Sequence, residues 1–297
     1  MISQTMDTTL TSFADAIRHA SEARTPLRLR GGGSKDFYGQ RLDGEVLDTR
    51  AYRGIVDYDP TELVITARCG TPLAEIESAL ADKGQLLAFE PPHFGDAATL
   101  GGCIAAGLSG PRRAAAGAVR DFVLGATLMN ARGEVLRFGG RVMKNVAGYD
   151  VSRLLAGSLG TLGLIVDISL KVLPNPPAEA TLSFEMEQAT ALRKLNEWAG
   201  KPLPISASAW RGGTLGVRLS GAAARSACAS PARRPRSRPR PHASPSTRRP
   251  ATSRPNRRAV SGTASANTAI RTSAAIARCG GCRYRRAPTR SHSLANN

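Results

Sequence analysis

The most informative segment of the chain reads PPHFGDAATLGGCIAAGLSG and occupies residues 91–110. Most of its residues are small, which lets the backbone lie flat against a large planar ligand where bulky side chains would not fit. The wider region, residues 90–120, holds nine Gly and Pro residues and little strand pattern. The segment therefore predicts a loop region that contacts a ligand.

A second glycine-rich segment, RGGGSK, occupies residues 30–35 and follows a short strand pattern in which Leu27 and Leu29 alternate with arginines. Three glycines remove the Cβ atoms that would keep an anion away, so successive backbone N–H groups can converge on phosphate oxygens. The segment fits neither GxGxxG nor GxxxxGK(S/T), so the dehydrogenase dinucleotide fold and the P-loop are poorly supported. Alone, such a triplet is typical of a plain turn.

A third cluster joins KNVAGYD, residues 144–150, to GSLGTLG, residues 157–163. The three glycine-dense clusters together extend from residue 30 to residue 163. Three such clusters predict an elongated cofactor that is threaded between two lobes. This combination outweighs the plain-turn interpretation of the glycine triplet.

Hydrophobic periodicity indicates the α+β class. Helices are predicted over residues 10–20 and after Thr71, which we expect to be the N-cap, with Gly84 as the stop signal. Strands are predicted at residues 45–47, 54–58, 63–67, 85–89 and 164–173, and a hairpin joins residues 122–129 to 134–138 around Asn130 to Gly133. The opening elements of another domain follow residue 177.

The sequence resembles the FAD-binding domain of the vanillyl-alcohol oxidase and p-cresol methylhydroxylase superfamily, and within it the E subunits of bacterial glycolate oxidase. The resemblance covers residues 1 to about 221 and rests on four stretches: RGGGSKDFYG (30–39), PPHFGDAATLGGCIAAGLSGPRR (91–113), RDFVLGATLMNARGEVLRFGGRVMKNVAGYD (120–150) and SRLLAGSLGTLGLI (152–165). It implies a two-lobed FAD-binding domain over residues 1–177 with a break near residues 58–60, followed by a truncated α+β cap domain over residues 178–221.

The resemblance also implies where a non-covalent FAD would lie. The loop from Gly31 to Lys35 and the turn from Thr99 to Gly102 would hold the pyrophosphate, residues 106–110 would run beside the isoalloxazine, and residues 163–165 would lie near the adenine. The expected cofactor-binding residues are Arg30, Gly31, Gly32, Gly33, Ser34, Lys35, Pro92, Gly95, Thr99, Leu100, Gly101, Gly102, Ala106, Gly107, Ser109, Gly110, Lys144, Gly163 and Ile165.

The implied activity is oxidation of glycolate, a small 2-hydroxy acid, to glyoxylate through flavin reduction. The implied partners are a larger flavoprotein subunit and an iron–sulfur subunit of a glycolate oxidase complex. An alternative is a related FAD-dependent oxidoreductase for another hydroxy acid. No residue of the sequence identifies itself as the catalytic base, and no metal site is expected.

The sequence leaves two interpretations open for several polar residues. His93 either lies near the flavin or is structural. Arg112 and Arg113 either attract a carboxylate or a partner subunit, or are solvated. Lys144 either neutralises the cofactor or faces water, and Asp150 is expected to cap the following helix.

The net charge of +18 is concentrated at the C-terminal end. Of the 41 basic residues, 17 are arginines between residues 225 and 297, a stretch without Lys, Asp or Glu, so residues 1–224 carry 24 basic and 23 acidic groups. Only four Leu, Ile, Val or Phe residues fall in that stretch, too few to form a packed core. We predict a disordered tail over residues 222–297.

The tail has two competing explanations. It is either a basic arm that binds nucleic acid or an out-of-frame translation of a GC-rich gene. The absence of Lys and the presence of a single aromatic residue, Tyr284, favour the second explanation, and no nucleic-acid partner is expected. Cys279 and Cys282 have the spacing of half a zinc knuckle, but the other half is missing.

The five cysteines do not form a disulfide framework, which fits a reducing compartment. No apolar run reaches the length that spans a bilayer, and the first residues lack the features of a signal peptide. The sequence predicts a cytoplasmic protein, or one peripheral to the inner membrane through its complex.

Overall fold

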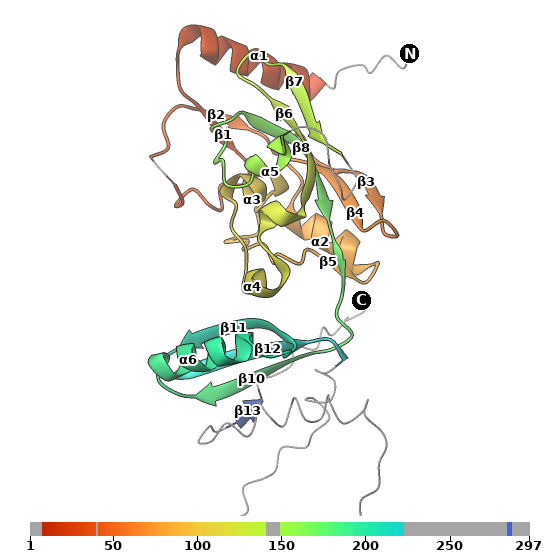
Figure 1. Cartoon of the computed structure of the whole chain (residues 1–297). Helices are drawn as coiled ribbons and strands as arrows, with labels where there is room; N and C mark the ends of the chain where they lie inside the picture. Colours follow the sequence, from red (N-terminus) through yellow and green to blue (C-terminus); the bar gives the residue numbers. More distant parts are fainter. Residues whose placement is uncertain (1–7, 40, 141–148, 223–283, 287–297) are drawn as a thin grey trace, which may run out of the picture. The chain divides into compact units, whose positions relative to one another are not determined.

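The computed structural model describes residues 8–39, 41–140, 149–222 and 284–286. The chain divides into two compact units. Unit 1 comprises Met1–Asn175 and Ser206–Ala209, and unit 2 comprises Pro176–Ile205 and Trp210–Asn297. Both units contain helices and strands, which confirms the α+β class (Figure 1).

Unit 1 contains most of the regular structure. In chain order its elements are α1 (Thr8–Ala23), β1 (Leu27–Arg30), β2 (Glu45–Asp48), β3 (Ile55–Asp59), β4 (Val64–Arg68), α2 (Leu73–Ala81), β5 (Gln85–Leu86), α3 (Leu100–Ala106), α4 (Arg113–Ala116), a 3-10 turn (Val119–Phe122), β6 (Val123–Met129), β7 (Val135–Gly139), α5 (Val151–Leu154), β8 (Leu164–Lys171) and β9 (Leu173–Pro174).

The largest sheet of unit 1 has five antiparallel strands in the order β3-β4-β8-β6-β7. Its central strand β8 buries alternate residues, Leu164, Val166, Ile168 and Leu170, as the period of a strand requires. The hairpin between β6 and β7 closes where it was predicted. Asn130 Oδ1 accepts hydrogen bonds from the amides of Arg132 and Glu134, at 2.9 and 3.0 Å.

A second, small sheet pairs β1 with β2 in parallel. Residues 58–60, near which a break between lobes was predicted, lie in the hairpin that joins β3 to β4, whose pairing runs from Ile55 with Ala67 to Asp59 with Val64. The change from one sheet to the other falls earlier, between the end of β2 at Asp48 and the start of β3 at Ile55.

The core of unit 1 is formed by helices and strands from distant parts of the sequence. Helix α2 contributes Leu73, Ile76 and Leu80, which are completely buried. Helix α1 contributes Phe13, whose ring meets the edge of Tyr52 at a centroid distance of 6.5 Å. Each fully buried Leu, Ile or Phe side chain stabilises the fold by roughly 1.5–3 kcal/mol.

Unit 2 contains β10 (Glu179–Glu185), α6 (Gln188–Ala199), β12 (Thr214–Ser220) and β13 (Tyr284–Arg286), together with the ends of β11 (Ile205–Arg211), whose residues 206–209 are assigned to unit 1. The strands form one sheet in the order β11-β12-β10-β13. Its core contains Phe184 against Trp198, with ring centroids 5.8 Å apart. Of the predicted tail, only Ala222 and β13 are described, and β13 pairs antiparallel with β10; the rest lies outside the described residues.

Across the described residues, no helix combines the length and the apolar character needed to cross a bilayer.

Candidate functional site

Two adjoining hollows in unit 1 form a groove, which we call the glycine groove. They share Leu29, Arg30, Gly31, Gly102, Ala105 and Leu159. The first hollow adds Thr49, Cys69, Gly101, Gly160, Gly163, Leu164 and Ile165. The second adds Arg28, Gly32, Gly33, Ser34, Lys35, Asp36, Tyr38, Arg41, Leu42, Thr99, Ala106 and Thr161. The second hollow has an empty volume of about 970 Å³, which includes space open to solvent.

The groove unites three segments that are far apart in the sequence, as the glycine pattern predicted. Residues 28–42, 99–106 and 159–165 all contribute to its wall. The third segment is hydrogen-bonded to helix α3: the amides of Gly157 and Leu159 donate to the carbonyl oxygens of Ile104 and Ala105, at 3.0 and 2.9 Å. Helix α3 is therefore the shared floor of the groove.

The structure gives a different reason for the three glycines at positions 31–33 from the one that the sequence suggested, which was space for an anion. A Cβ atom on Gly31 would lie 2.2 Å from Thr99 Oγ1, and one on Gly32 would lie 1.5 Å from the carbonyl oxygen of Ala97. The first two glycines are thus required by close packing of the loop on residues 97–99. Gly33 has a φ of +69°, in the left-handed region that favours glycine.

Gly102 differs from these positions. Thr99 is the N-cap of helix α3, and its hydroxyl accepts a hydrogen bond from the Gly102 amide at 3.4 Å. A Cβ atom built on Gly102 would meet only Thr99 Oγ1, at 3.3 Å, and Gly102 lines both hollows. Apart from this one tight contact, a Cβ atom at position 102 would meet no other atom within 4 Å and would face the groove, which fits a ligand that approaches the backbone closely.

The second hollow is rich in positive charge. Arg28, Arg30, Lys35 and Arg41 line it, together with one carboxylate, Asp36. Lys35 Nζ donates to the carbonyl oxygen of His93 at 3.4 Å. Partial burial lowers the pKa of Lys35, and the nearby Cys103 thiol offsets part of this effect. Four cations beside a glycine-rich loop suit an anionic group such as a diphosphate.

The first hollow is mostly apolar and contains a cysteine that sequence reasoning missed. Burial raises the pKa of Cys69 to about 12, and the charge of Asp167 acts in the same direction. Leu29 and Thr49 were also missed as site residues, whereas Leu159 lies within the predicted GSLGTLG cluster. Pairing between distant segments brings Leu29, Thr49 and Cys69 into the wall, and no short motif marks them. Only the alternating pattern before the glycine triplet hinted at Leu29.

Most of the predicted cofactor-binding residues line the groove. They are Arg30, Gly31, Gly32, Gly33, Ser34, Lys35, Thr99, Gly101, Gly102, Ala106, Gly163 and Ile165. Among the described residues, six predicted positions line neither hollow: Pro92, Gly95, Leu100, Gly107, Ser109 and Gly110. Lys144 lies outside the described residues.

The positions beside the groove have structural tasks. Leu100 is completely buried in the core, and Ser109 Oγ accepts a hydrogen bond from the Val119 amide at 2.9 Å. Gly107 ends helix α3 with a φ of +67°, and a Cβ atom there would lie 2.7 Å from Gly157 Cα. A Cβ atom on Gly110 would lie 2.4 Å from the carbonyl oxygen of Glu90.

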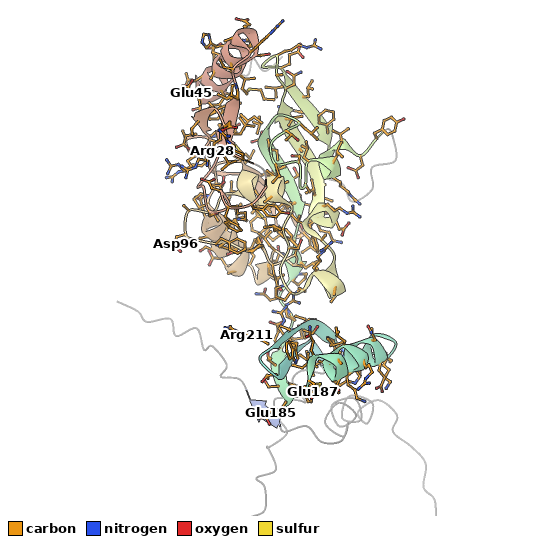
Figure 2. The ribbon with its side chains drawn as sticks, turned by 90° about the vertical axis from the view of Figure 1, so that its left-hand side faces the viewer. Arg28, Glu45, Asp96, Glu185, Glu187 and Arg211 are labelled. Carbon is orange, nitrogen blue, oxygen red and sulfur yellow. The ribbon has the colours of Figure 1, made fainter. Side chains whose placement is uncertain are left out.

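The structure also bears on the polar residues for which the sequence left two interpretations open. His93 Nε2 contacts Glu77 Oε1 at 3.1 Å, which favours the structural role. Glu90 binds Arg112 through the Arg112 amide, at 2.8 Å, and through Nε, at 3.4 Å. Arg113 is exposed and lines a separate polar hollow beside Gly107. Figure 2 labels Arg28, Glu45 and Asp96 among the side chains of unit 1.

Two further expectations concern caps and metals. Asp150 caps helix α5, since its carboxylate accepts the Arg153 amide at 3.2 Å. Within the described ranges, no cluster of three or more His, Cys, Asp or Glu side chains could hold a metal ion. Cys279 and Cys282 lie outside the described residues.

Comparison with known families gives a match over most of unit 1. Residues 8–139 match the family model described as "FAD binding domain". The chain is also similar to solved structures of alkyldihydroxyacetonephosphate synthase, with a TM-score of 0.56 and 18% identity over 70% of this chain and 45% of that one. At this level of identity the second similarity concerns the fold alone.

Three curated relatives are similar in sequence. The glycolate oxidase subunit GlcE of Escherichia coli K12 is 52% identical over 210 residues, which are 71% of this chain and 60% of that protein. The glycolate oxidase subunit GlcD of Bacillus subtilis is 34% identical, over 63% and 40%. A D-lactate dehydrogenase of Archaeoglobus fulgidus is 31% identical, over 64% and 43%. The chain spans about half the length of these relatives.

Proposed function

We propose that this chain, whose residues 8–139 match a family model described as an FAD binding domain, is the FAD-binding subunit of a complex that oxidises glycolate to glyoxylate. The observation that carries the proposal is the glycine groove, in which three glycine-rich segments meet beside a set of cations. The similarity to a glycolate oxidase subunit over 71% of this chain supports the choice of substrate.

Residues of the groove divide by the part of FAD that they would hold. The loop from Gly31 to Lys35 and the turn from Thr99 to Gly102 would hold the diphosphate, where cations and amides gather. Residues 105–106 of helix α3 would lie beside the flavin ring, and residues 163–165 would lie near the adenine. Binding would be non-covalent, because the loop of residues 31–39 offers no histidine for a covalent link.

FAD supplies the hydride acceptor in reactions of this class. The contribution of this chain is to bind and orient the cofactor and to exclude water from one side of it. Arg112 is engaged with Glu90, so it is not our choice for the substrate carboxylate. We assign the catalytic base to a partner or to a cap domain, since no titratable side chain of the groove is suitably placed to be singled out.

The proposed partners are a larger flavoprotein subunit and an iron–sulfur subunit. The support for this part is that two relatives are named as subunits of glycolate oxidase. The iron–sulfur subunit would carry electrons away from the flavin. In isolation, this chain is then expected to bind FAD without appreciable turnover.

The experiment is reconstitution of the purified chain with FAD, followed by removal of free flavin. We expect retained flavin absorption and quenching of the flavin fluorescence. Addition of the two partner subunits should then allow glycolate to bleach the flavin band. A protein that retains no flavin contradicts the cofactor site, whereas retained flavin with no bleaching in the assembled complex contradicts the activity.

A second candidate is oxidation of a different 2-hydroxy acid by the same site. It is favoured by the similarity to a D-lactate dehydrogenase. A panel of glycolate, D-lactate and D-2-hydroxyglutarate, monitored by flavin bleaching in the assembled complex, separates the two candidates. Faster bleaching by D-lactate than by glycolate would favour the second.

A further inference from the structure

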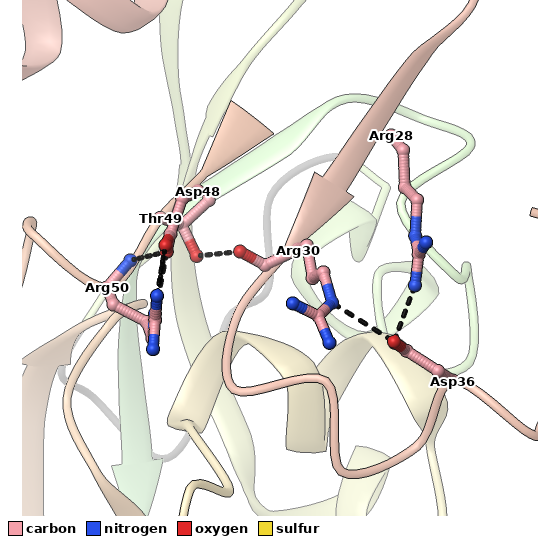
Figure 3. Close-up of polar contacts among 6 residues, drawn as sticks. All are labelled: Arg28, Arg30, Asp36, Asp48, Thr49 and Arg50. Carbon is pink, nitrogen blue, oxygen red and sulfur yellow. Dashed lines mark hydrogen bonds and ion pairs between the residues drawn. The ribbon is translucent and has the colours of Figure 1, made fainter. Parts of the chain in front are cut away.

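One carboxylate, that of Asp36, links the loop that follows strand β1 back to two arginines of the strand. Asp36 Oδ2 lies 2.5 Å from Arg28 Nη2 and 3.0 Å from Arg30 Nε (Figure 3). The two arginines are two positions apart on β1, so their side chains lie on the same face of the strand. A single oxygen therefore joins both guanidinium groups to the far end of the loop.

The loop is wrapped around Arg30. A Cβ atom on Gly33 would lie 2.2 Å from Arg30 Nη2, which shows how closely the guanidinium packs on the loop backbone. Two turns complete the wrapping: the Asp36 amide donates to the Gly33 carbonyl at 3.2 Å, and the Tyr38 amide donates to the Lys35 carbonyl at 2.9 Å. The Arg30 guanidinium therefore packs against the loop backbone at Gly33 while its side chain stays partly exposed.

The charge state of Asp36 suits this arrangement. Partial burial acts to raise its pKa, but the hydrogen bonds and charges of Arg28 and Arg30 outweigh burial, and the pKa is lowered. Asp36 is accordingly ionised at neutral pH. Hydrogen bonds between ionised groups are stronger and more directional than neutral ones, so they hold the loop in one conformation.

We propose that Asp36 is a positioning residue for the cofactor: its carboxylate fixes Arg28 and Arg30 against the loop and so holds the amides of residues 31–35 ready to receive a diphosphate. This inference rests on the proposed assignment of the glycine groove as the FAD site. Preorganised donors cost less to arrange when the ligand binds, which increases affinity.

The opposite role makes the opposite prediction. If Asp36 merely occupied the two arginines as an internal competitor of the ligand, its removal would free them and strengthen the binding of anions. The sign of the change in affinity therefore separates positioning from competition.

The experiment compares FAD dissociation constants of the full chain and its variants by fluorescence quenching, with ADP as a competing ligand that carries the same diphosphate. Asp36→Asn should raise the dissociation constants for FAD and for ADP about fivefold to tenfold, as the loss of a charged hydrogen-bond acceptor at a partly exposed site predicts. Asp36→Glu should restore at least part of both affinities.

The matched control is Asp48→Asn. Asp48, the last residue of the neighbouring strand β2, forms an ion pair with Arg50, which follows the strand, and neither residue lines the groove. Figure 3 shows this ion pair together with the two that Asp36 forms. The control should leave both dissociation constants within about twofold of the wild-type value, since exposed pairs contribute little.

If Asp36→Asn does not fold, Arg28→Gln removes one of the two contacts and should raise the FAD dissociation constant about threefold. Unchanged or tighter binding of FAD by a folded Asp36→Asn or Arg28→Gln variant overturns the positioning role. A wild-type chain that binds neither FAD nor ADP overturns the site assignment instead, so the two failures are distinguishable.

Discussion

The α-carbon of Gly32 faces the backbone carbonyl oxygen of Ala97, and a Cβ atom built on Gly32 would lie 1.5 Å from that oxygen. The contact joins the loop after β1 to the segment before helix α3. Because the obstacle is backbone, it cannot turn aside as a flexible side chain would. Gly32 therefore sets the distance between two walls of the glycine groove.

Gly32→Ala is expected to destabilise unit 1 and to weaken FAD binding together. Overpacking against a well-packed structure costs about 1–3 kcal/mol, and a clash with backbone belongs at the upper end of that range. Urea unfolding of the apoprotein and FAD titration measure the two effects. A variant of normal stability would show that the loop can move away from Ala97 at little cost.

Gly102→Ala should lower the affinity for FAD without lowering the stability of the apoprotein. Position 102 lies in helix α3, where alanine stabilises the helix by about 0.5–1 kcal/mol relative to glycine, and the nearest obstacle is Thr99 Oγ1 at 3.3 Å. The new methyl group would occupy open groove instead. We expect an unchanged or raised melting temperature of the apoprotein, with FAD affinity reduced about tenfold or more.

The Gly32 and Gly102 variants are matched controls for one another, since both add one methyl group to a glycine that lines the groove, one against backbone and the other towards the groove. A Gly102→Ala protein that binds FAD as tightly as the wild type would contradict the placement of the diphosphate at this turn.

The sequence predicted the segments of the groove but not the reason for their composition. The pattern RGGGS was interpreted as space for an anion, whereas Gly31 and Gly32 leave space for Thr99 and Ala97. A contact across 65 residues has no local signature. Gly102, whose Cβ position is open, fits the original interpretation better.

Local signals succeeded where the partners are close in the sequence. The β6–β7 hairpin was predicted from the turn sequence between two strand patterns. The structure shows why a local signal was sufficient, since Asn130 accepts hydrogen bonds from the amides of its own turn. Thr71 was predicted to be an N-cap, but the structure places Pro72 there, and the Thr71 hydroxyl exchanges hydrogen bonds with the backbone of Gly54. The competing partner, Gly54, directly precedes strand β3 and lies 17 residues before Thr71 in the sequence, so only the tertiary structure reveals it. Thr49 and Cys69 also line the groove because of contacts with distant parts of the sequence, which only the tertiary structure reveals.

Cys69 and Cys103 are expected to be inert towards thiol reagents in the folded protein. Burial raises the pKa of each thiol to about 12, so the reactive thiolate is almost absent at pH 8. In a variant with serine at positions 228, 279 and 282, a disulfide reagent should titrate no thiol until urea is added, and two thiols afterwards. Rapid labelling without urea would show that the first hollow opens to solvent.

The carboxyl group of Asp167 should lower the free energy of unfolding as the pH rises, which is the reverse of the usual contribution of a carboxyl group in a folded protein. Burial raises its pKa, and the charge of Arg68, a hydrogen bond from Tyr52 and the charge of Arg137 offset only part of the rise. Its Oδ1 atom is buried and has no hydrogen-bond partner in the described part of the chain. A folded-state pKa above the unfolded value of about 3.9 means that the folded protein keeps this proton longer, so this group costs stability as the pH rises from about 4 towards 7.

Asp167→Asn removes that ionisation. The free energy of unfolding of the variant minus that of the wild type should therefore increase between pH 4.5 and pH 7, by an amount on the order of 1 kcal/mol, and then level off. Asp59→Asn is the control with the opposite sign, because hydrogen bonds from Thr61 and Glu62 lower the pKa of Asp59. Its stabilising effect is present above the unfolded pKa and is lost as the pH falls, so the Asp59 variant should be the less stable protein at pH 7 and approach the wild type only in acid. Urea titrations of both variants at several pH values measure the two slopes, and equal slopes would contradict a buried, desolvated carboxylate at position 167.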